Sequence, residues 1–457
     1  MELEKDLAEY AVKISKAEYC EARAEEEIKK VYILKNGEFE SSVEEKNKGI
    51  GIRVISNGAS FVSLTNLSKK NVREALKEAL REARLSSPIS LSEEKAYKAS
   101  YKVTGELPNE EKIKEFLIEL DRKSSFEWIK SKLLILSITQ TKKYFVNSDG
   151  SKIYSEIRRF HLEYNLIGKK GNKVEQRNFF FGSSGAWKDF LSLKVEEKIE
   201  DEAKKMIKII NAKKSKKGVY DVILAPELVG IVVHESCGHP LEADRILGRE
   251  AAQAGESYAK MDSIGRKIGS EKVTIVDDPT VKNSYGFYLF DDEGVKAKRK
   301  FLIKNGIINE FLLNRETALF LNIKSNGSAR AMNFAREPLI RMSNTFMLPG
   351  DYNLNEMIED VKSGILIKSF TEWNIDDLRW NEKYVGFEAY EIVKGEIRDF
   401  VRRPTIETTT EELYSKVDAC SKDLQFVTGT CGKGEPMQGV PVWMGGPYIR
   451  IRSLRVK

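Results

Sequence analysis

Two of the three histidines in this 457-residue chain, His234 and His239, lie five positions apart, and Glu235 directly follows the first. Imidazole nitrogens ligate zinc, and a neighbouring carboxylate can take a proton from a water on the metal, so these residue types indicate a hydrolytic zinc site. The common H-E-x-x-H motif places its histidines four positions apart on one helical face. A spacing of five turns the second histidine roughly 140° away from the first on a regular α-helix. One ion could be shared only if the helix were locally overfilled or ended there.

Two neighbouring residues favour a departure from the regular helix. Gly238 tolerates a distorted backbone, and a one-turn π-bulge of the kind needed here is often found at functional sites. Pro240 disfavours ordinary helical geometry at His239, the residue before it. A buried strand is expected at residues 222–226, before the motif. The sequence therefore predicts a strand followed by a helix that is overfilled by one residue at the histidines.

The composition argues against several classes of protein. The 76 Lys and Arg against 70 Asp and Glu give a net charge of +6, without a basic stripe interleaved with aromatics, so nucleic-acid binding is not expected. No apolar stretch approaches the ~20 residues that cross a membrane, and the acidic N-terminus is unlike a signal peptide. Four cysteines are too sparse for a disulfide framework. We expect a cytoplasmic protein without membrane contact.

The N-terminal part is predicted to combine helices with hairpin-connected strands. A charged amphipathic helix comes first, short strands follow at residues 31–34 and 51–55, and Ser68 is the expected N-cap of a second helix. Tight turns are expected where an asparagine or aspartate precedes a glycine, because these residue types accept positive φ: Asn36-Gly37, Asn57-Gly58 and Asp149-Gly150.

The rest of the chain divides at a lysine-rich stretch, residues 211–218, which is the best linker candidate. Most of the sequence after it is typical of β-structure. We therefore predict an α+β fold, with an N-terminal helix and antiparallel-sheet domain at residues 1–217 and a β-rich C-terminal domain at 218–457 that carries the metal-site helix. The first domain can be divided further into about 1–100 and 101–217.

A catalytic zinc normally has three protein ligands and one open position, so a third ligand is needed. Cys237 lies three residues after His234 and is one candidate, although a small buried side chain in a helix is at least as good an interpretation of it. Cys431 is the other candidate. It lies in a glycine-rich loop at residues 429–434, where Lys433 would favour the thiolate that binds metal. These considerations rank Cys431 only slightly ahead of Cys237.

The remaining candidates carry weaker signals. His161 lies among strand residues and is expected to be a hydrogen-bonded structural residue, and Cys420 is expected in the core after a short helix. Glu242 and Asp244 could orient an imidazole by a hydrogen bond to its second ring nitrogen, the one that does not bind the metal, or could equally belong to a solvated helix end. The acidic run at residues 291–293 is more typical of a polar turn than of a second metal site.

The motifs together resemble the TldD/PmbA family, and within it the TldD proteins. The segments that carry the resemblance are 234–244, 284–288, 291–294, 341–345, the cysteine segment 429–433 and 438–442. It extends over nearly the whole chain, and the histidine and cysteine motifs are its most specific parts. The family consists of zinc metallopeptidases. The resemblance implies that His234, His239 and Cys431 bind one Zn²⁺ and that Glu235 is the general base.

The resemblance also implies a substrate and a partner. Unfolded or short peptides would reach an enclosed site in extended form, as an added strand. TldD proteins commonly work with a paralogue, TldE or PmbA, that lacks the metal motif, so a dimer is expected, formed either with itself or with such a paralogue.

The leading hypothesis is hydrolysis of peptides by zinc-bound water with Glu235 as general base. Two alternatives differ in class. One is a zinc-containing regulatory or scaffold subunit, for which four protein ligands would be expected. The other is a modulator of a nucleic-acid enzyme, which the near-neutral charge does not favour.

Overall fold

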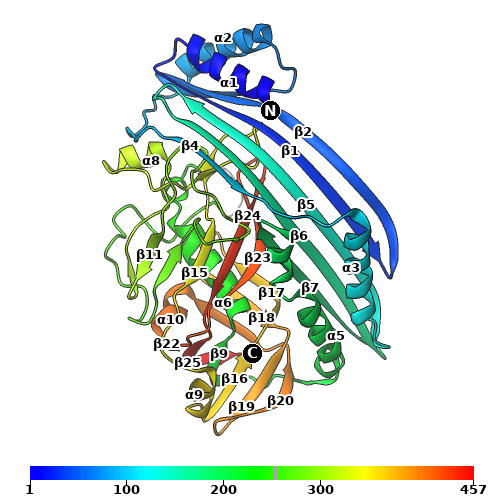
Figure 1. The fold of residues 1–457 in the computed structure, drawn as a ribbon. Helices are drawn as coiled ribbons and strands as arrows, with labels where there is room; N and C mark the ends of the chain where they lie inside the picture. The colour runs from blue at the N-terminus through cyan, green and yellow to red at the C-terminus, as the bar shows by residue number, and fades with distance from the viewer. Residues whose placement is uncertain (251–254) are drawn as a thin grey trace.

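Three large β-sheets, with helices packed against them, form the described part of the chain in the computed structural model, which covers residues 1–250 and 255–457 (Figure 1). Long, curved strands from the N-terminal half lie along one side, and the shorter strands of the C-terminal half lie beside them. The predicted α+β class, with a helix and antiparallel-sheet region before a β-rich region, is confirmed. The boundary at residues 217/218 stays a prediction.

The first sheet has the strand order β3-β2-β1-β5-β6, and both β4 and β7 pair with β6. Neighbouring strands are antiparallel except β4, which is parallel to β6. The bounds are β1 Tyr19–Lys35, β2 Glu38–Ser56, β3 Gly58–Leu64, β4 Lys98–Val103, β5 Ile129–Asn147, β6 Lys152–Lys170 and β7 Lys173–Ser184. One sheet therefore joins the two subdivisions considered for residues 1–217, and its strands are much longer than the short ones predicted.

Helices cover one face of this sheet at both ends. The helices are α1 Glu2–Ile14 and α2 Lys69–Leu85 at one end, and α3 Glu110–Lys123 and α5 Val195–Asn211 at the other. On β1, Ala22 and Ala24 pack with α1 and α2, whereas Tyr32 and Leu34 pack with α3 and α5. These residues are even numbers apart and so point to the same face. Ser68 caps α2 as predicted, its Oγ accepting from Asn71 N at 3.1 Å.

The two C-terminal sheets enclose the metal-site helix. One has the order β12-β11-β10-β15-β24-β23, and the other β17-β18-β21-β25-β9-β16-β19-β20-β8, with β22 on β25. The bounds in the first are β10 Ile275–Asp277, β11 Lys300–Lys304, β12 Ile307–Ile308, β15 Asn344–Met347, β23 Gln425–Lys433 and β24 Gln438–Gly446. In the second they are β8 Lys213–Lys214, β9 Gly218–Leu224, β16 Ser363–Ile367, β17 Phe370–Ile375, β18 Asn381–Gly386, β19 Ala389–Val393, β20 Glu396–Arg402, β21 Thr405–Thr409, β22 Val417–Cys420 and β25 Ile449–Val456.

Short elements complete the fold. They are α4 Trp187–Leu191, α6 Pro226–Val233, α7 Ala243–Ile246, α8 Arg315–Phe320, α9 Leu354–Glu359, α10 Thr410–Ser415 and the two-stranded pair β13 Ala329–Arg330 and β14 Leu339–Ile340. Helix α6 follows β9 directly and packs on β15, β23 and β24. Its residues after Glu227 are apolar and buried, which is the pattern of a helix enclosed on all sides.

The other face of the N-terminal sheet packs on the C-terminal region through buried charges. Arg53 on β2 pairs with Glu21 on β1 (Nε to Oε1, 3.0 Å) and with Glu293 (Nη2 to Oε1, 2.7 Å). Lys143 on β5 pairs with Asp292 at 2.7 Å. The acidic run 291–293, interpreted as a polar turn, is therefore a buried contact between the two halves of the chain.

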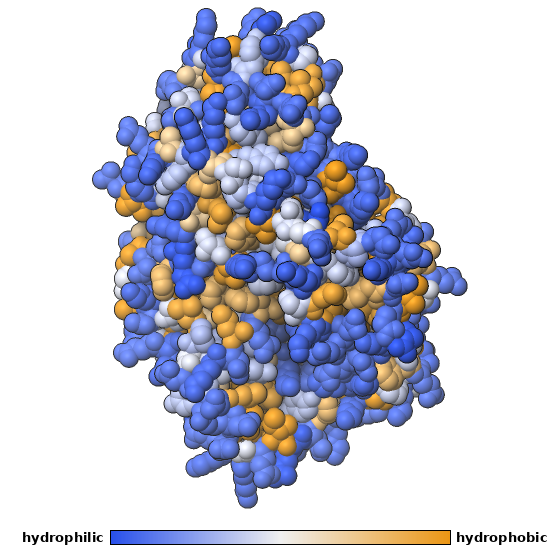
Figure 2. All heavy atoms as spheres, in the orientation of Figure 1, coloured by the Kyte–Doolittle hydropathy of each residue, from blue (hydrophilic) through white to orange (hydrophobic). Residues whose placement is uncertain are grey.

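The surface is largely polar. Figure 2 shows hydrophilic side chains over most of one face, with apolar side chains gathered in small groups between them. Among the described residues, no helix combines the length and the apolar character that a membrane crossing requires.

Replacing Arg53 by methionine should destabilise the fold, because Glu21 and Glu293 would stay buried without their cation. The expected loss in the free energy of unfolding is about 3–5 kcal/mol. Urea unfolding measures it. The matched change Lys30→Met removes an exposed ion pair with Glu44 and should alter stability by about 0.5 kcal/mol or less. Equal effects of the two changes would contradict a structural role for the Arg53 cluster.

Candidate metal centre

The predicted extra residue in the histidine helix is present as one π-helical turn. Helix α6 continues into this turn (η1, His234–Gly238), and a short 3₁₀ turn (η2, His239–Leu241) follows. The His239 N–H donates to the His234 carbonyl, five residues earlier, which is the π-helical hydrogen bond. This bond brings the two histidines onto one side of the helix.

The roles expected for Gly238 and Pro240 are different in the structure. Gly238 has ordinary right-handed helical angles, φ −59° and ψ −63°, so it is not needed for backbone freedom. A Cβ at this position would lie 1.8 Å from Met342 Sδ, so the glycine allows close packing. His239 keeps helical angles, φ −60° and ψ −46°, although Pro240 follows it. The helix tightens from π to 3₁₀ at this point and does not leave the helical region.

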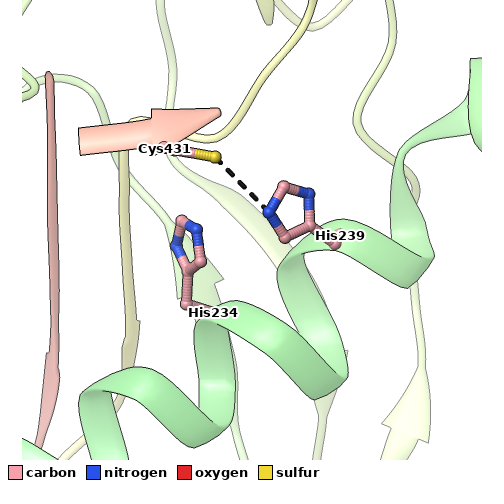
Figure 3. A group of neighbouring side chains, drawn as sticks. All are labelled: His234, His239 and Cys431. Atoms are coloured by element: carbon pink, nitrogen blue, oxygen red, sulfur yellow. Dashed lines mark hydrogen bonds between the residues drawn. The ribbon is translucent and has the colours of Figure 1, made fainter. Parts of the chain in front are cut away.

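The structure brings His234, His239 and Cys431 together. One donor atom from each lies within 4.8 Å of the others, and all three residues are buried. His239 Nε2 and Cys431 Sγ are 3.4 Å apart, and the two imidazole ring centroids are 4.9 Å apart with their planes at 84°. Figure 3 shows the histidines on successive turns of the helix and Cys431 facing them from a strand. That strand is β23, where a loop was predicted.

These residues fit a zinc ion. Donor atoms on a tetrahedral zinc are separated by about 3.5 Å, which is close to the spacing between Cys431 Sγ and His239 Nε2. His234 Nδ1 is buried and has no hydrogen-bond partner among residues 1–250 and 255–457. Burial lowers the pKa of His234, which favours the neutral imidazole that binds metal. Two nitrogens and one sulfur form a donor set typical of zinc.

The Cys431 thiol is easily ionised, but not because of Lys433. Burial would raise its pKa, yet His239 and the Arg341 guanidinium lower it to about 7. Arg341 is fully buried and also donates to the Cys431 carbonyl. Lys433 Nζ instead binds a carbonyl and carboxylates, with Asp244 Oδ1 at 2.7 Å.

Glu242 and Asp244 differ in their relation to the histidines. Glu242 Oε2 lies 3.1 Å from His239 Nδ1, which leaves His239 Nε2 directed at Cys431. Burial would raise the pKa of Glu242, but Lys433 and His239 hold it well below its usual range. The Asp244 carboxylate bonds Lys433 and the Arg245 N–H rather than an imidazole. The expected orienting role therefore fits Glu242, and Asp244 reaches the site only through Lys433.

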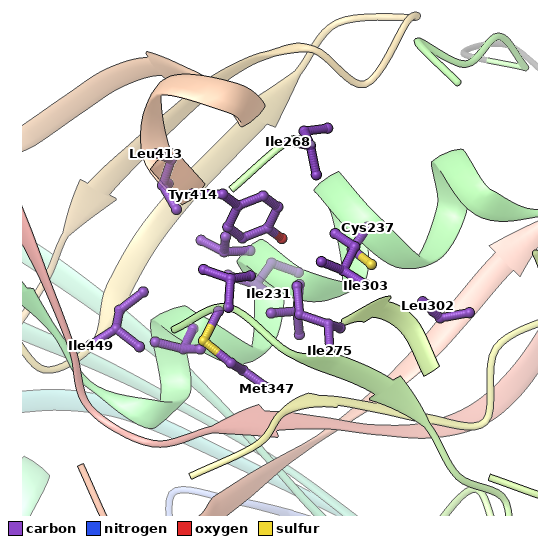
Figure 4. Close-up of a cluster of buried hydrophobic side chains, with 14 of the residues drawn as sticks. Ile231, Cys237, Ile268, Ile275, Leu302, Ile303, Met347, Leu413, Tyr414 and Ile449 are labelled. Carbon is purple, nitrogen blue, oxygen red and sulfur yellow. The ribbon is translucent and has the colours of Figure 1, made fainter. Parts of the chain in front are cut away.

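Cys237, the rival ligand, is not one of the three grouped donors. It belongs to the apolar core between the two C-terminal sheets, with Ile231, Ile275 and Ile303 (Figure 4). Burial raises the pKa of its thiol well above the ordinary value. Cys20 and Cys420 are also buried, and Cys420 is the last residue of strand β22, which follows the short helix α10.

His161 differs from its predicted role. It stacks on Tyr285 and Phe180, with ring centroids 5.3 and 6.1 Å away, and its Nε2 is buried without a hydrogen-bond partner in the described part of the chain. Burial lowers its pKa to about 4. The expected hydrogen-bonded structural histidine is therefore a stacked, neutral one.

A cleft of about 1330 Å³ gives access to the group and is lined by His234, Glu235, His239 and Cys431. Aromatic side chains from β7, β23 and β24 also line it: Phe179, Phe180, Phe181, Phe426 and Trp443. Glu235 is buried, and its Oε2 accepts a hydrogen bond from Arg379 Nη1. Neither Arg379 nor Arg341 was found as a site residue from the sequence. Arg341 lies in a segment that resembles the family, whereas Arg379 lies in a turn without any motif.

Sequence models of PmbA/TldA metallopeptidase domain 1, central domain and C-terminal domain match residues 20–86, 103–219 and 217–457. The chain belongs to the PmbA/TldD metallopeptidase family. A metalloprotease of Methanocaldococcus jannaschii is 33% identical over 430 residues, which cover 91% of this chain and 92% of the relative. A zinc metalloprotease TldD homolog of Saccharolobus solfataricus is 30% identical over 69% of this chain and 68% of its own length.

Solved structures share the fold of this PmbA/TldD protein. A Thermotoga maritima protein superposes with a TM-score of 0.79 over 100% of this chain and 99% of its own, at 18% identity. TldE from Thermococcus kodakarensis gives a TM-score of 0.74 over 99% of each chain, also at 18% identity.

Metal analysis of purified variants tests which cysteine binds zinc. Cys431→Ala should lose the metal, because a sulfur donor disappears from the group. Cys237→Ala should keep it, because that side chain is not one of the grouped donors. The reverse pattern would contradict this assignment.

Zinc binding should weaken as the pH falls below about 7, the pKa of the Cys431 thiol. The lowered pKa leaves the thiolate free above this pH, whereas below it a proton competes with the metal. The apparent affinity should then fall at least about tenfold per pH unit, measured by competition with a chromophoric chelator. An affinity that stays constant from neutral to mildly acidic pH would contradict this prediction.

Proposed function

We propose that this chain is a zinc-dependent metallopeptidase that hydrolyses unfolded or short peptides. The observation that carries the proposal is the position of the Glu235 carboxylate, next to His234 in the sequence and in the same cleft as His234, His239 and Cys431. Three donors leave one coordination position for water or substrate, as in catalytic zinc sites.

The chain's residues have separate roles in this proposal. His234, His239 and Cys431 hold Zn²⁺, which when bound lowers the pKa of water and polarises carbonyl oxygens. Glu235 takes the proton of the attacking water and later delivers it to the leaving nitrogen. Glu242 fixes the orientation of the His239 ring through Nδ1.

The form of the cleft supports an extended peptide as substrate. Strand β23, which carries Cys431, is the last strand of its sheet and lines the cleft. An edge strand presents unpaired N–H and C=O groups, and a peptide can bind to them as an additional strand. Side chains of both charges and several aromatics line the cleft, which suits mixed peptide sequences better than one charged class.

The alternative of a zinc-containing scaffold subunit is less well supported. A structural zinc normally has four protein ligands. Within residues 1–250 and 255–457, the candidate group contains three donor residues and opens to a large cleft. Association with a second chain, either this one or a TldE-like paralogue, stays a prediction from the family resemblance, and so does a cytoplasmic location.

Glu235→Gln tests the proposed general base. The amide keeps the shape but cannot accept the proton, so kcat should fall by about 10²–10⁴ while zinc content stays unchanged. Peptide digestion followed by mass spectrometry, with metal analysis of the same sample, measures both. The control Glu372→Gln alters an exposed glutamate paired with Lys383 on β18 and should leave the rate unchanged. Near wild-type cleavage by Glu235→Gln would remove Glu235 as the base.

A further inference from the structure

We propose that Arg379 stabilises the negative charge that develops on the carbonyl oxygen of the scissile peptide bond. This role rests on the peptidase function proposed above and adds the group that neither the sequence nor the family motifs identify.

The backbone holds Arg379 in a fixed place. It lies in the turn between β17 and β18 with φ of +61°, a conformation that residues other than glycine and asparagine rarely adopt. Its N–H donates to the Asp376 carbonyl (3.0 Å), and its own carbonyl accepts from Thr410 Oγ1 (3.0 Å). The neighbouring Leu378 carbonyl accepts from Tyr258 N at 2.8 Å. An unusual conformation that is fixed from several sides is often found at functional sites.

The guanidinium has donors to spare in the cleft. The Arg379 side chain is 11% exposed and lines the same cleft as Glu235 and the metal group. Nη1 donates to Glu235 Oε2. Nε is buried and lacks a partner among residues 1–250 and 255–457, although an arginine offers five N–H donors in a rigid fork. A second acceptor close to Glu235 could therefore be bound without moving the backbone.

The charges around Arg379 balance throughout the proposed step. An O–H bond of water breaks, its proton goes to the Glu235 carboxylate, and the freed electron pair forms the bond to the carbonyl carbon. The π electrons move onto the carbonyl oxygen, which becomes negative as Glu235 becomes neutral. In the second half of the step, the electron pair on the negative oxygen re-forms the C=O double bond. The C–N bond then breaks, and the leaving nitrogen takes the proton from Glu235.

Arg379 therefore has one anionic partner before the step and another during it. The spare donor can meet the neutral carbonyl only weakly, whereas a charge-assisted bond to an oxyanion is about twice as strong. The contact is thus stronger in the transition state than in the ground state, and such a contact raises kcat rather than lowering KM.

The test compares Arg379→Met and Arg379→Gln with wild-type, zinc-loaded protein. The matched control is Arg403→Met, because Arg403 also has positive φ (50°) and also pairs with a buried glutamate, Glu175, but lies outside the cleft. Kinetics on a peptide that the wild type cleaves should show kcat reduced about 100-fold or more in both Arg379 variants, with KM changed less than about threefold. Zinc content should stay the same, and Arg403→Met should match the wild type.

A binding measurement gives a readout that does not depend on turnover. A phosphinic peptide mimics the anionic tetrahedral intermediate, and Arg379→Met should bind it about 100-fold more weakly than the wild type does. The uncleaved substrate peptide is measured with the inactive variants Glu235→Gln and Glu235→Gln/Arg379→Met. Its dissociation constants for the two should differ by less than about threefold.

Three results would overturn the role of Arg379: an unchanged kcat in a metal-loaded variant, a loss confined to KM, or equal weakening of both ligands. If Arg379→Met misfolds or loses zinc, Arg379→Gln decides, because glutamine can still donate to Glu235 but has no charge; normal turnover in that variant refutes the proposal. If the wild type itself cleaves no peptide and binds no phosphinic peptide, the proposed function fails, and not only this inference.

Discussion

The hydrogen bond from the His239 N–H to the His234 carbonyl is the interaction on which the site depends. With an ordinary α-helical turn, the second imidazole would point away from the first, and Cys431 could meet only one of them. The π-turn is maintained by its surroundings, since α6 lies buried between two sheets and Met342 packs directly on Gly238. A local irregularity of one residue thus becomes a fixed arrangement of ligands.

The cleft depends on a second constraint, the polar contact between the two halves of the chain. The helices cover one face of the N-terminal sheet, so its other face is free to pack on the C-terminal region. Buried ion pairs such as Arg53 with Glu293 need matched geometry on both sides and therefore fix the relative position of the halves. With that position fixed, β7 contacts β23, and residues of both strands line the cleft.

The sequence predicted the parts of the site that depend on local spacing. The spacing of five positions between the histidines predicted an overfilled turn, and Glu242, considered as a partner for an imidazole, lies 3.1 Å from His239 Nδ1. Cys431 lies 192 residues from His239, and its loop ranked it only slightly ahead of Cys237 until the family resemblance separated the two. Spacing along the chain contains no information on such a contact. Likewise, Arg379 contacts Glu235 although it lies in a turn 144 residues further along the chain. The length of the strands in the first sheet was underestimated because their solvent-facing residues are charged, as in β2.

Anomalous diffraction at the zinc edge from crystals of zinc-loaded protein would test the central claim most directly. We expect one peak, bonded to His234, His239 and Cys431, with a water in the fourth position and Glu235 close to that water. A peak at another place, or a fourth protein side chain on the zinc, would contradict a catalytic site at the π-turn.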